Sequence, residues 1–511
     1  MLESTADLIE PLSHDRVRFI HPLRELAKLL LAISPAAGWQ VFGAGHGRRL
    51  RLQNLARRDH ARSHLETLMT PGIPGPSVVD RAAPVRRVKQ SSINDAGPMT
   101  KQFDWYKHWY PVNVVDTMDP TRTHEVQLLG LNLVAWNDGA TVDKKKQSGT
   151  WHVSVEACTH CKAYPSKVED GFLWVFPYNG PHATSEAAQV ALPLISELHD
   201  PAVKDRWKWR IPAGVRNFPC GWDAMLENTL DPAHFLCAHH GTLSNRYTDP
   251  APYEFEMERK IDKEGGFAMT GGMGKLEFVP PCLVKYTPDY AGMPFKGALV
   301  IATYLVPTRP GWVRPLANVL YDKDRKLGNT IAERALRLFI AGLTPDWAGH
   351  IGSSVVLHQD AGLLYKQFRN MRERGYNDPA LEAKSSKRYE QLVFCPNGID
   401  KGVLAFRQWL RTYAGNGVPW ACQDELLPRG SEDIYDMWYA HTEHCQYCQT
   451  AHRNLQIAKY ASLVLGVIAV LGVQDGTREP LLAIAAVLLA GALHKVTQLF
   501  QRYEYSHADC D

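Results

Sequence analysis

The stretch Glu227–His240, ENTLDPAHFLCAHH, constrains this chain more than any other. It contains Asn228, Asp231, His234 and His239 in the spacing N-x2-D-x2-H-x4-H. On a continuous helix of 3.6 residues per turn, histidines five positions apart point about 140° away from each other. A helix that loosens here can turn both imidazoles toward one ion. Two histidines and a carboxylate form the facial triad of non-haem Fe(II) oxygenases, which leaves positions open for O2. The alternative is a pair of unrelated helix histidines.

Length and composition limit the other possibilities. A chain of 511 residues is too long for one simple core, so we expect two or three domains. Its 45% hydrophobic and 22% charged residues are typical of a globular protein, not a disordered one. Because there is no arginine-rich strip with interleaved aromatic residues, nucleic-acid binding is not favoured. Ten cysteines do not indicate a disulfide scaffold, although two close pairs occur, Cys158 with Cys161 and Cys445 with Cys448.

Residues 1–98 differ from the rest of the chain. Between Arg16 and Asn94 there are 14 lysines and arginines against four acidic residues. Arginine-rich, acid-poor N-termini are typical of organelle transit peptides, and His21–Ile33 has the pattern of a short amphipathic helix. Four acids within the first fifteen residues count against this interpretation. We predict a transit peptide, with an untargeted extension as the alternative.

Residues 103–182 have the pattern of an antiparallel β domain, with short β-rich runs separated by turn residues such as Asp138-Gly139. Residues 200–410 then combine predicted strands with helices, which favours an α+β fold. In the first region the runs are FDWYKHWYPVNVV, VQLLGLNLVAWND, GTWHVSV and Phe172–Phe176. In the second, the predicted strands are Tyr253–Ile261, Gly266–Thr270, Leu276–Tyr286, Ala298–Pro307 and Val313–Tyr321, and the helices are Ile331–Ala341 and Val356–Glu373.

Several of these runs resemble one family. FDWYKHWYPV, LLGLNLVAW, CTH and AYPSKVEDGFLWVFP are similar to the Rieske domain of plastid Rieske-type oxygenases of the pheophorbide a oxygenase-like group, which includes chlorophyllide a oxygenase and the Tic-associated Rieske protein. The resemblance continues through ENTLDPAHFLCAHHG and LHQDAGLLYKQ to YDMWYAHTEHCQYC, over roughly residues 103–500. It implies a helix-grip catalytic domain, a Rieske [2Fe–2S] cluster and a mononuclear iron.

The resemblance also implies the roles of individual residues. Asp360 in LHQDAGLLYKQ occupies the position of the third iron ligand, beside His234 and His239. Asp231 resembles the aspartate that links the Rieske histidine of one subunit to the iron histidine of its neighbour. Physically, a carboxylate there can accept an imidazole N–H and orient the ring. Asn228 is expected near the iron without binding it. The alternatives are a solvent-facing helix residue for Asp360 and a turn residue before Pro232 for Asp231.

The Rieske motif is incomplete. A Rieske centre has two cysteines on one iron and two histidines on the other, which the family supplies as C-x-H and, after a loop, C-x2-H. Cys158 and His160 match the first half, but the chain then continues directly into CKAYPSK, which resembles the sequence after the cluster. Cys237-x2-His240 has the second spacing but lies inside the iron motif. We therefore predict a truncated Rieske domain, through a missing segment or a degenerate member of the family.

The segment 432–454 contains Cys445-x2-Cys448 with His441, His444 and His452 nearby. Such a pair can act as a redox dithiol, and the CxxC at the C-terminus of the family favours that role. Two thiolates and two imidazoles can instead hold zinc, or the thiols can be inert.

Two apolar runs, Tyr460–Val473 and Leu481–Leu493, lie within residues 455–500. Each is shorter than the roughly 20 residues that a spanning helix needs. Lys459 and Lys495 can lengthen the effective span by extending their side chains toward the interface. As a consecutive pair they predict a membrane hairpin, and the resemblance implies a membrane anchor.

The predicted function is a monooxygenase in a chloroplast membrane, thylakoid or inner envelope, that acts on a chlorophyll-related tetrapyrrole in chlorophyll catabolism. The resemblance implies a ferredoxin-type electron donor, a homotrimer, and electron transfer through Asp231 to iron on His234, His239 and Asp360. The alternatives are a catalytically impaired membrane protein that binds tetrapyrroles, and an iron protein supplied with electrons by another subunit.

Overall fold

The computed structural model describes twelve segments of the chain, all in one compact unit. They are residues 102–139, 149–155, 163–210, 215–240, 244–248, 254–289, 297–324, 344–376, 388–395, 398–422, 431–471 and 479–504. The predicted transit segment, the amphipathic helix His21–Ile33, the half-motif Cys158 and His160, and the helix Ile331–Ala341 lie outside the described residues.

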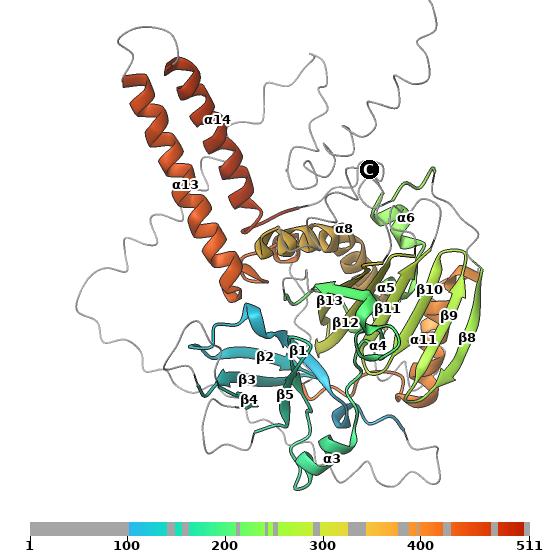
Figure 1. Ribbon diagram of the computed structural model, residues 1–511. Helices are drawn as coiled ribbons and strands as arrows, with labels where there is room; N and C mark the ends of the chain where they lie inside the picture. Colours follow the sequence, from blue (N-terminus) through green and yellow to red (C-terminus); the bar gives the residue numbers. More distant parts are fainter. Residues whose placement is uncertain are drawn as a thin grey trace, which may run out of the picture. The chain divides into compact units, whose positions relative to one another are not determined.

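Two small antiparallel sheets form the N-terminal β region (Figure 1). The run VQLLGLNLVAWND is a hairpin and not one strand, because the chain reverses at Leu129 and Gly130, both with positive φ. A Cβ on Gly130 would lie 2.7 Å from the backbone nitrogen of Cys422, so the close approach there requires glycine. One sheet has the order β1 (Tyr110–Val114), β6 (Phe172–Val175), β5 (Ser166–Glu169), and the other β2 (His124–Leu128), β3 (Leu131–Asn137), β4 (Trp151–Ser154).

A seven-stranded antiparallel sheet forms the centre of the larger region (Figure 1). The predicted single strand Leu276–Tyr286 is wrong in one respect, because it is a hairpin that turns at Pro280–Cys282. Proline cannot donate to a strand ladder, so two consecutive prolines end the first strand. The order is β7 (Trp207–Arg210), β13 (Trp312–Asp322), β12 (Leu299–Arg309), β11 (Leu283–Pro288), β10 (Gly274–Val279), β9 (Gly266–Gly271), β8 (Phe255–Asp262).

Three helices position the site residues. The helix α5 (Trp222–Leu230) contacts β11, β12 and β13, while α11 (Lys401–Tyr413) contacts β8, β9 and α5. The long helix α8 (Asp346–Glu373) also contacts α5, and it begins ten residues before the predicted start at Val356. The shorter helices are α3 (Ala183–Gln189), α4 (Ser196–His199), α6 (His234–Ala238), α10 (Arg388–Leu392), α12 (Ser431–Ile434) and the 3-10 turns Trp105–Lys107, Val115–Thr117, Lys204–Arg206, Gly398–Asp400 and Thr442–His444.

One continuous hydrophobic core joins the β region to the central sheet. The rings of Trp174 and Tyr304 meet edge to face with centroids 5.3 Å apart, and Phe103 meets Trp409 at 5.1 Å. The backbone N–H groups of Leu129 and Gly130 donate to Pro307 and Thr308 at the end of β12. The described parts of residues 103–182 and 200–410 are therefore packed as one α+β body.

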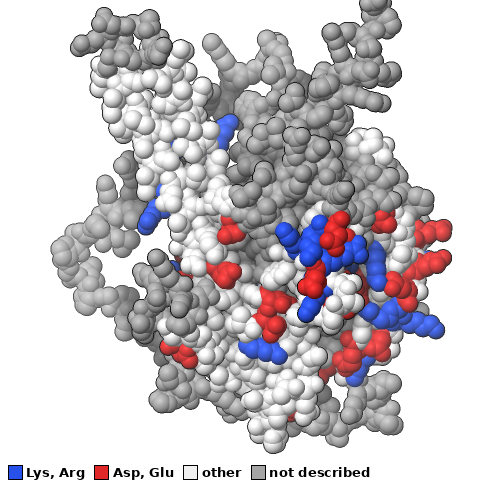
Figure 2. All heavy atoms as spheres, viewed as in Figure 1, with Lys and Arg blue, Asp and Glu red and all other residues white. Residues whose placement is uncertain are grey.

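The C-terminal part is a pair of antiparallel helices, α13 (Gln446–Leu471) and α14 (Glu479–Gln498), which contact each other along their length (Figure 1). Both are long and apolar enough to cross a membrane. They exceed the predicted runs because the polar segment before Tyr460 and the residues after Leu493 continue the helices. Leu465, Leu471 and Leu488 are more than 60% exposed, and Figure 2 shows the hairpin almost free of charged side chains in that view.

Candidate metal centre

The turn between α5 and α6 gives the two motif histidines their directions. Asp231 ends α5 in an extended conformation, as expected for a residue before proline. Its Oδ1 accepts a hydrogen bond from the backbone N–H of Ala233 at 2.9 Å, which closes a tight turn. His234 then begins α6, and His239 lies just past its end with non-helical dihedral angles. The short helix α6 therefore ends at Ala238, and the separation of about 140° expected on a continuous helix does not hold for His239.

These two histidines and Asp360 form a three-residue cluster. One ligand atom from each lies within 4.8 Å of the other two. The Nε2 of His239 is 3.6 Å from Oδ2 of Asp360, and both side chains are buried. Asp360 comes from the middle of α8, 121 positions after His239 in the sequence. The packing of α8 on α5 therefore brings the carboxylate to the histidines.

Hydrogen bonds fix both imidazoles with Nε2 available to a metal. The Nδ1–H of His234 donates to the backbone carbonyl of Asp231, and that of His239 donates to Oε1 of Gln359 at 2.6 Å. A partner on Nδ1 selects the tautomer whose lone pair is on Nε2. Gln359 was not identified from the sequence, although its place beside Asp360 on α8 was a usable signal.

The residues fit a mononuclear iron. The Oδ1 of Asp360 is buried and has no hydrogen-bond partner, which is costly for a carboxylate oxygen unless a cation or water satisfies it. Two neutral imidazoles and one carboxylate are the donor set of non-haem Fe(II) oxygenases. This donor set would therefore suit a mononuclear Fe(II).

Asp231 and Asn228 lie at the edge of the cluster. Burial raises the pKa of Asp231, an effect that the nearby His234 partly offsets. Asn228 is in the last turn of α5, where its backbone carbonyl accepts the N–H of Asp231 at 3.3 Å. The structure therefore assigns Asn228 a backbone contact with the turn.

Comparison with known proteins identifies a similar family. Residues 278–378, which include all of α8 and so Asp360, match the family described as pheophorbide a oxygenase. The chain is similar to the pheophorbide a oxygenase family. The chloroplastic pheophorbide a oxygenase of Oryza sativa subsp. japonica is 24% identical and is covered over 94% of its length by 91% of this chain.

Two further relatives are named for other roles. The chloroplastic protochlorophyllide-dependent translocon component 52 of Arabidopsis thaliana is 24% identical over 80% of this chain and 87% of that protein. The chloroplastic flavonoid 8-hydroxylase 2 of Ocimum basilicum is 23% identical over 80% of this chain and 86% of that protein. The Arabidopsis alignment has 521 positions, more than the 511 residues of this chain, so that relative has residues opposite gaps here.

The Rieske cluster of the family does not fit the ligands present. Val153 and Tyr164 form an antiparallel bridge, with the N–H of Tyr164 donating to Val153 at 2.8 Å. One short connection therefore joins them, and it contains Cys158, His160 and Cys161, all outside the described residues. A cluster needs a second histidine, and residues 154–163 contain only His160.

Gln359 provides a test of the ligand geometry. We expect Gln359→Leu to lower iron affinity about 10- to 100-fold, because the apolar side chain cannot accept the Nδ1–H of His239. Iron titration of the metal-free protein against a competing chelator measures this. Gln359→Glu keeps the acceptor and should retain iron, and equal affinity of the Leu variant and the wild type would contradict the orienting role.

A second buried cluster lies at the base of the helical hairpin. Cys445 and Cys448, the predicted redox pair, lie beside His441 and His350, and all four side chains are buried. His350 is in α8, about 95 positions before the cysteines, and the sequence did not indicate it.

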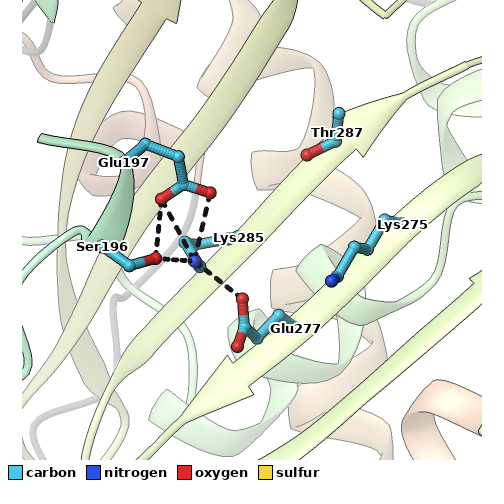
Figure 3. Close-up of a pocket in the computed structure, with 6 residues that line it drawn as sticks. All are labelled: Ser196, Glu197, Lys275, Glu277, Lys285 and Thr287. Carbon is cyan, nitrogen blue, oxygen red and sulfur yellow. Dashed lines mark hydrogen bonds and ion pairs between the residues drawn. The ribbon is translucent and has the colours of Figure 1, made fainter. Parts of the chain in front are cut away.

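A polar pocket of about 210 Å³ opens on the central sheet (Figure 3). Buried Lys285 bonds Glu277 at 2.7 Å and Glu197 at 3.2 Å. Burial alone would raise the pKa of Glu277, but Lys285 and Arg259 outweigh it and hold that pKa below its usual value. The pocket's charges are therefore paired structural contacts, unlike the mostly apolar lining of a site for a large ring system. Its lining residues are Ser196, Glu197, Lys275, Glu277, Lys285 and Thr287.

Proposed function

We propose that this chain is an oxygenase that holds Fe(II) on His234, His239 and Asp360 and acts on a chlorophyll-related tetrapyrrole. The observation that carries the proposal is the meeting of these three ligands around the unpartnered Oδ1 of Asp360, in a chain that is similar to pheophorbide a oxygenases. When bound, such an iron supplies a site for O2 and the redox chemistry of oxygen insertion.

The protein's own contribution is geometric. Asp231 and Gln359 hold the imidazoles through their Nδ1–H groups, so that Nε2 of each faces Asp360. Because Asp360 and Gln359 share α8, which packs on α5, and His234 and His239 flank α6 directly after α5, the three ligands would be held in one arrangement. Electrons would come from a ferredoxin-type donor.

The tetrapyrrole assignment is supported by relatives named for pheophorbide and protochlorophyllide. A relative named as a flavonoid hydroxylase makes the flavonoid class the comparison to include in the assay. The hairpin of α13 and α14 supports a membrane location, and the chloroplastic relatives support a plastid one. We place the protein in the thylakoid or inner envelope membrane.

A second candidate function follows from the incomplete Rieske motif. With Cys158 and His160 but no second half-motif, the chain would be a catalytically silent membrane protein that binds a tetrapyrrole. In a third arrangement, another subunit would supply electrons to the iron of this chain.

Turnover and metal content separate these possibilities. Full-length protein in detergent is incubated with NADPH, ferredoxin, ferredoxin reductase, ¹⁸O2, and pheophorbide, protochlorophyllide or a flavonoid. The proposal predicts ¹⁸O in a tetrapyrrole product, and none in a His234→Ala variant. Tetrapyrrole binding without product, at full iron occupancy, would support the silent protein, while product from the flavonoid alone would overturn the substrate class.

Acid-labile sulfide tests the Rieske interpretation separately. About one iron per chain and no acid-labile sulfide would rule out a self-contained oxygenase and leave the silent protein or the arrangement in which another subunit supplies the electrons, because a cluster needs four ligands. Two sulfides with two additional irons would show that the cluster is complete and that our interpretation of the gap is wrong. Transcript sequencing across the codons for His160 and Cys161 would reveal a C-x2-H segment if one has been lost.

A further inference from the structure

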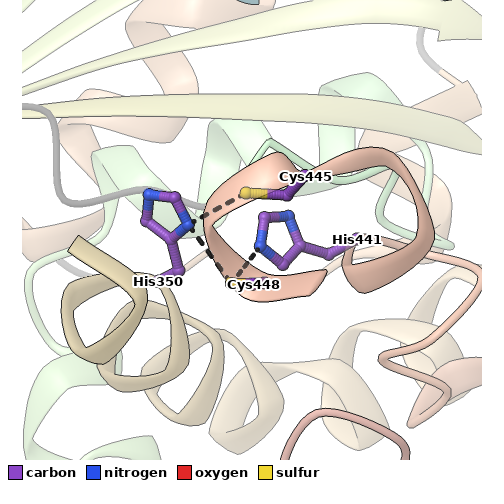
Figure 4. A group of neighbouring side chains, drawn as sticks. All are labelled: His350, His441, Cys445 and Cys448. Atoms are coloured by element: carbon purple, nitrogen blue, oxygen red, sulfur yellow. Dashed lines mark hydrogen bonds between the residues drawn. The ribbon is translucent and has the colours of Figure 1, made fainter. Parts of the chain in front are cut away.

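Four metal-ligating side chains converge where the helical hairpin meets α8 (Figure 4). His350 lies in the second turn of α8, His441 and Cys445 flank the 3-10 turn Thr442–His444, and Cys448 is in the first turn of α13. One ligand atom from each lies within 4.8 Å of the other three. The Nδ1 of His350 is 3.4 Å from the sulfur of Cys445 and 3.5 Å from that of Cys448.

His441 is held in the orientation that a metal ligand needs. Its Nδ1 lies 3.1 Å from the backbone carbonyl of Val215, to which an Nδ1–H donates. Its Nε2 lies 3.1 Å from the sulfur of Cys448. A carbonyl partner on one ring nitrogen fixes the tautomer that presents the other nitrogen to a metal.

The four side chains are buried in a small hydrophobic cluster that is separate from the main core. His350 and His441 are 3% and 1% exposed, and Cys445 and Cys448 are 2% and 0% exposed. Their neighbours include Ile351, Val355, Ala451, Leu499 and Phe500, which come from α8, α13 and the end of α14. A cluster this small provides limited hydrophobic stabilisation, which a bound metal typically supplements.

We propose that His350, His441, Cys445 and Cys448 hold one structural zinc ion. Tetrahedral zinc with bonds of about 2.3 Å to sulfur and about 2.0 Å to nitrogen places its ligand atoms roughly 3.3–3.8 Å apart. The distances around His350 agree with that range and the His441–Cys448 distance is slightly shorter. Two thiolates and two imidazoles in a closed, buried site are the ligands of structural zinc.

Two other uses of this ligand set fit less well. A redox dithiol needs an exposed sulfur that a partner can attack, whereas the sulfurs of Cys445 and Cys448 are enclosed. Two cysteines and two histidines are also the ligands of a Rieske cluster, but there two irons separate the nitrogens from the sulfurs. Here the nitrogen of His350 lies 3.4 Å from a cysteine sulfur, so the site has room for a single ion.

The zinc would connect the hairpin of α13 and α14 to α8, the helix that carries Asp360. His350 and Asp360 are ten residues apart on α8, about 15 Å along its axis. The other three ligands belong to the segment that leads into α13. A metal shared between them fixes the start of α8 relative to the hairpin, independently of whether the iron is bound.

Elemental analysis of the full-length protein in detergent tests the proposal. We expect about one zinc per chain, with extended X-ray absorption showing two sulfur ligands near 2.3 Å and two nitrogen ligands near 2.0 Å. His350→Ala should lose at least nine-tenths of the zinc while keeping iron. Asp360→Ala should lose iron while keeping zinc, so the two sites fail separately.

The matched control is His444→Ala, because His444 is exposed between two of the ligands. It should keep all of its zinc. If His350→Ala does not fold, mercurial titration of the wild type replaces it, and the zinc should leave as Cys445 and Cys448 react. Zinc content unchanged by His350→Ala would overturn the proposal. So would a wild-type protein with a Cys445–Cys448 disulfide and no zinc, or with iron in this site.

Discussion

Replacing Asp360 with alanine should reduce the iron content of the purified protein to less than about one-tenth of the wild-type value. The carboxylate is the only charged ligand of the three-residue cluster. It is buried, and its Oδ1 has no hydrogen-bond partner among the described residues. Changes to residues that merely orient a ligand cost about 10- to 100-fold in metal affinity, so loss of a ligand should cost at least as much. Oxygen incorporation should fall with the iron.

Iron and zinc are measured on the same samples by elemental analysis. Glu373→Ala is the matched control, because Glu373 is on the same helix with its side chain 60% exposed. It should leave both metals unchanged. An Asp360→Ala protein with wild-type iron and a wild-type melting temperature would show that another group completes the site.

Replacing Arg407 with methionine should destabilise the protein by about 3–5 kcal/mol, because it leaves buried carboxylates without their partner. Arg407 in α11 bonds Asp223 at 3.0 Å and contacts Glu227 more closely, and both acids are in α5. It also donates to the hydroxyl of Tyr376 at 2.6 Å. Burial raises the pKa of Glu227 to about 7 even with Arg407 present. Since α5 leads directly into the turn before His234, the variant should also bind iron more weakly.

The loss of stability in Arg407→Met should depend on pH, and its direction follows from the pKa of Glu227. In the variant the folded-state pKa of Glu227 lies further above its unfolded value, so the folded state binds the additional proton. The free energy of unfolding of each protein rises as pH falls below its own folded-state pKa of Glu227, so the gap to the wild type should narrow as pH falls toward about 7 and stay constant below it.

The apparent melting temperature in detergent measures the effect, with an expected decrease on the order of 10 °C. Arg369→Met is the control, because the Arg369–Glu373 pair is exposed and contributes little. The double variant Arg407→Met with Glu227→Gln should recover part of the loss, because the uncompensated charge is gone. Equal melting temperatures for Arg407→Met and Arg369→Met would contradict a stabilising role for the network.

Local pattern predicted most of the described strands. Alternation and turn residues located β8, β9, β12 and β13 to within a few residues. It failed where one apolar run holds two strands, as in Leu276–Tyr286, because both strands of that hairpin are buried and the turn contains prolines within the run. It also shortened α8, whose first turns include buried polar residues such as His350 and Ser354 and so lack an obvious apolar stripe.

The motif Glu227–His240 by itself predicted the two histidines of the candidate iron site, because Pro232 ends α5 and the histidines then flank the short helix α6. The sequence also carried the incomplete Rieske motif and the apolar hairpin. Only the tertiary structure brought in the groups from α8: Gln359 behind His239, and His350 beside the cysteines. Gln359 and His350 lie about a hundred residues away from the histidine and the cysteines that they contact, so no local spacing in the sequence predicts these contacts. Their meeting depends on how α8 packs against α5 and α13.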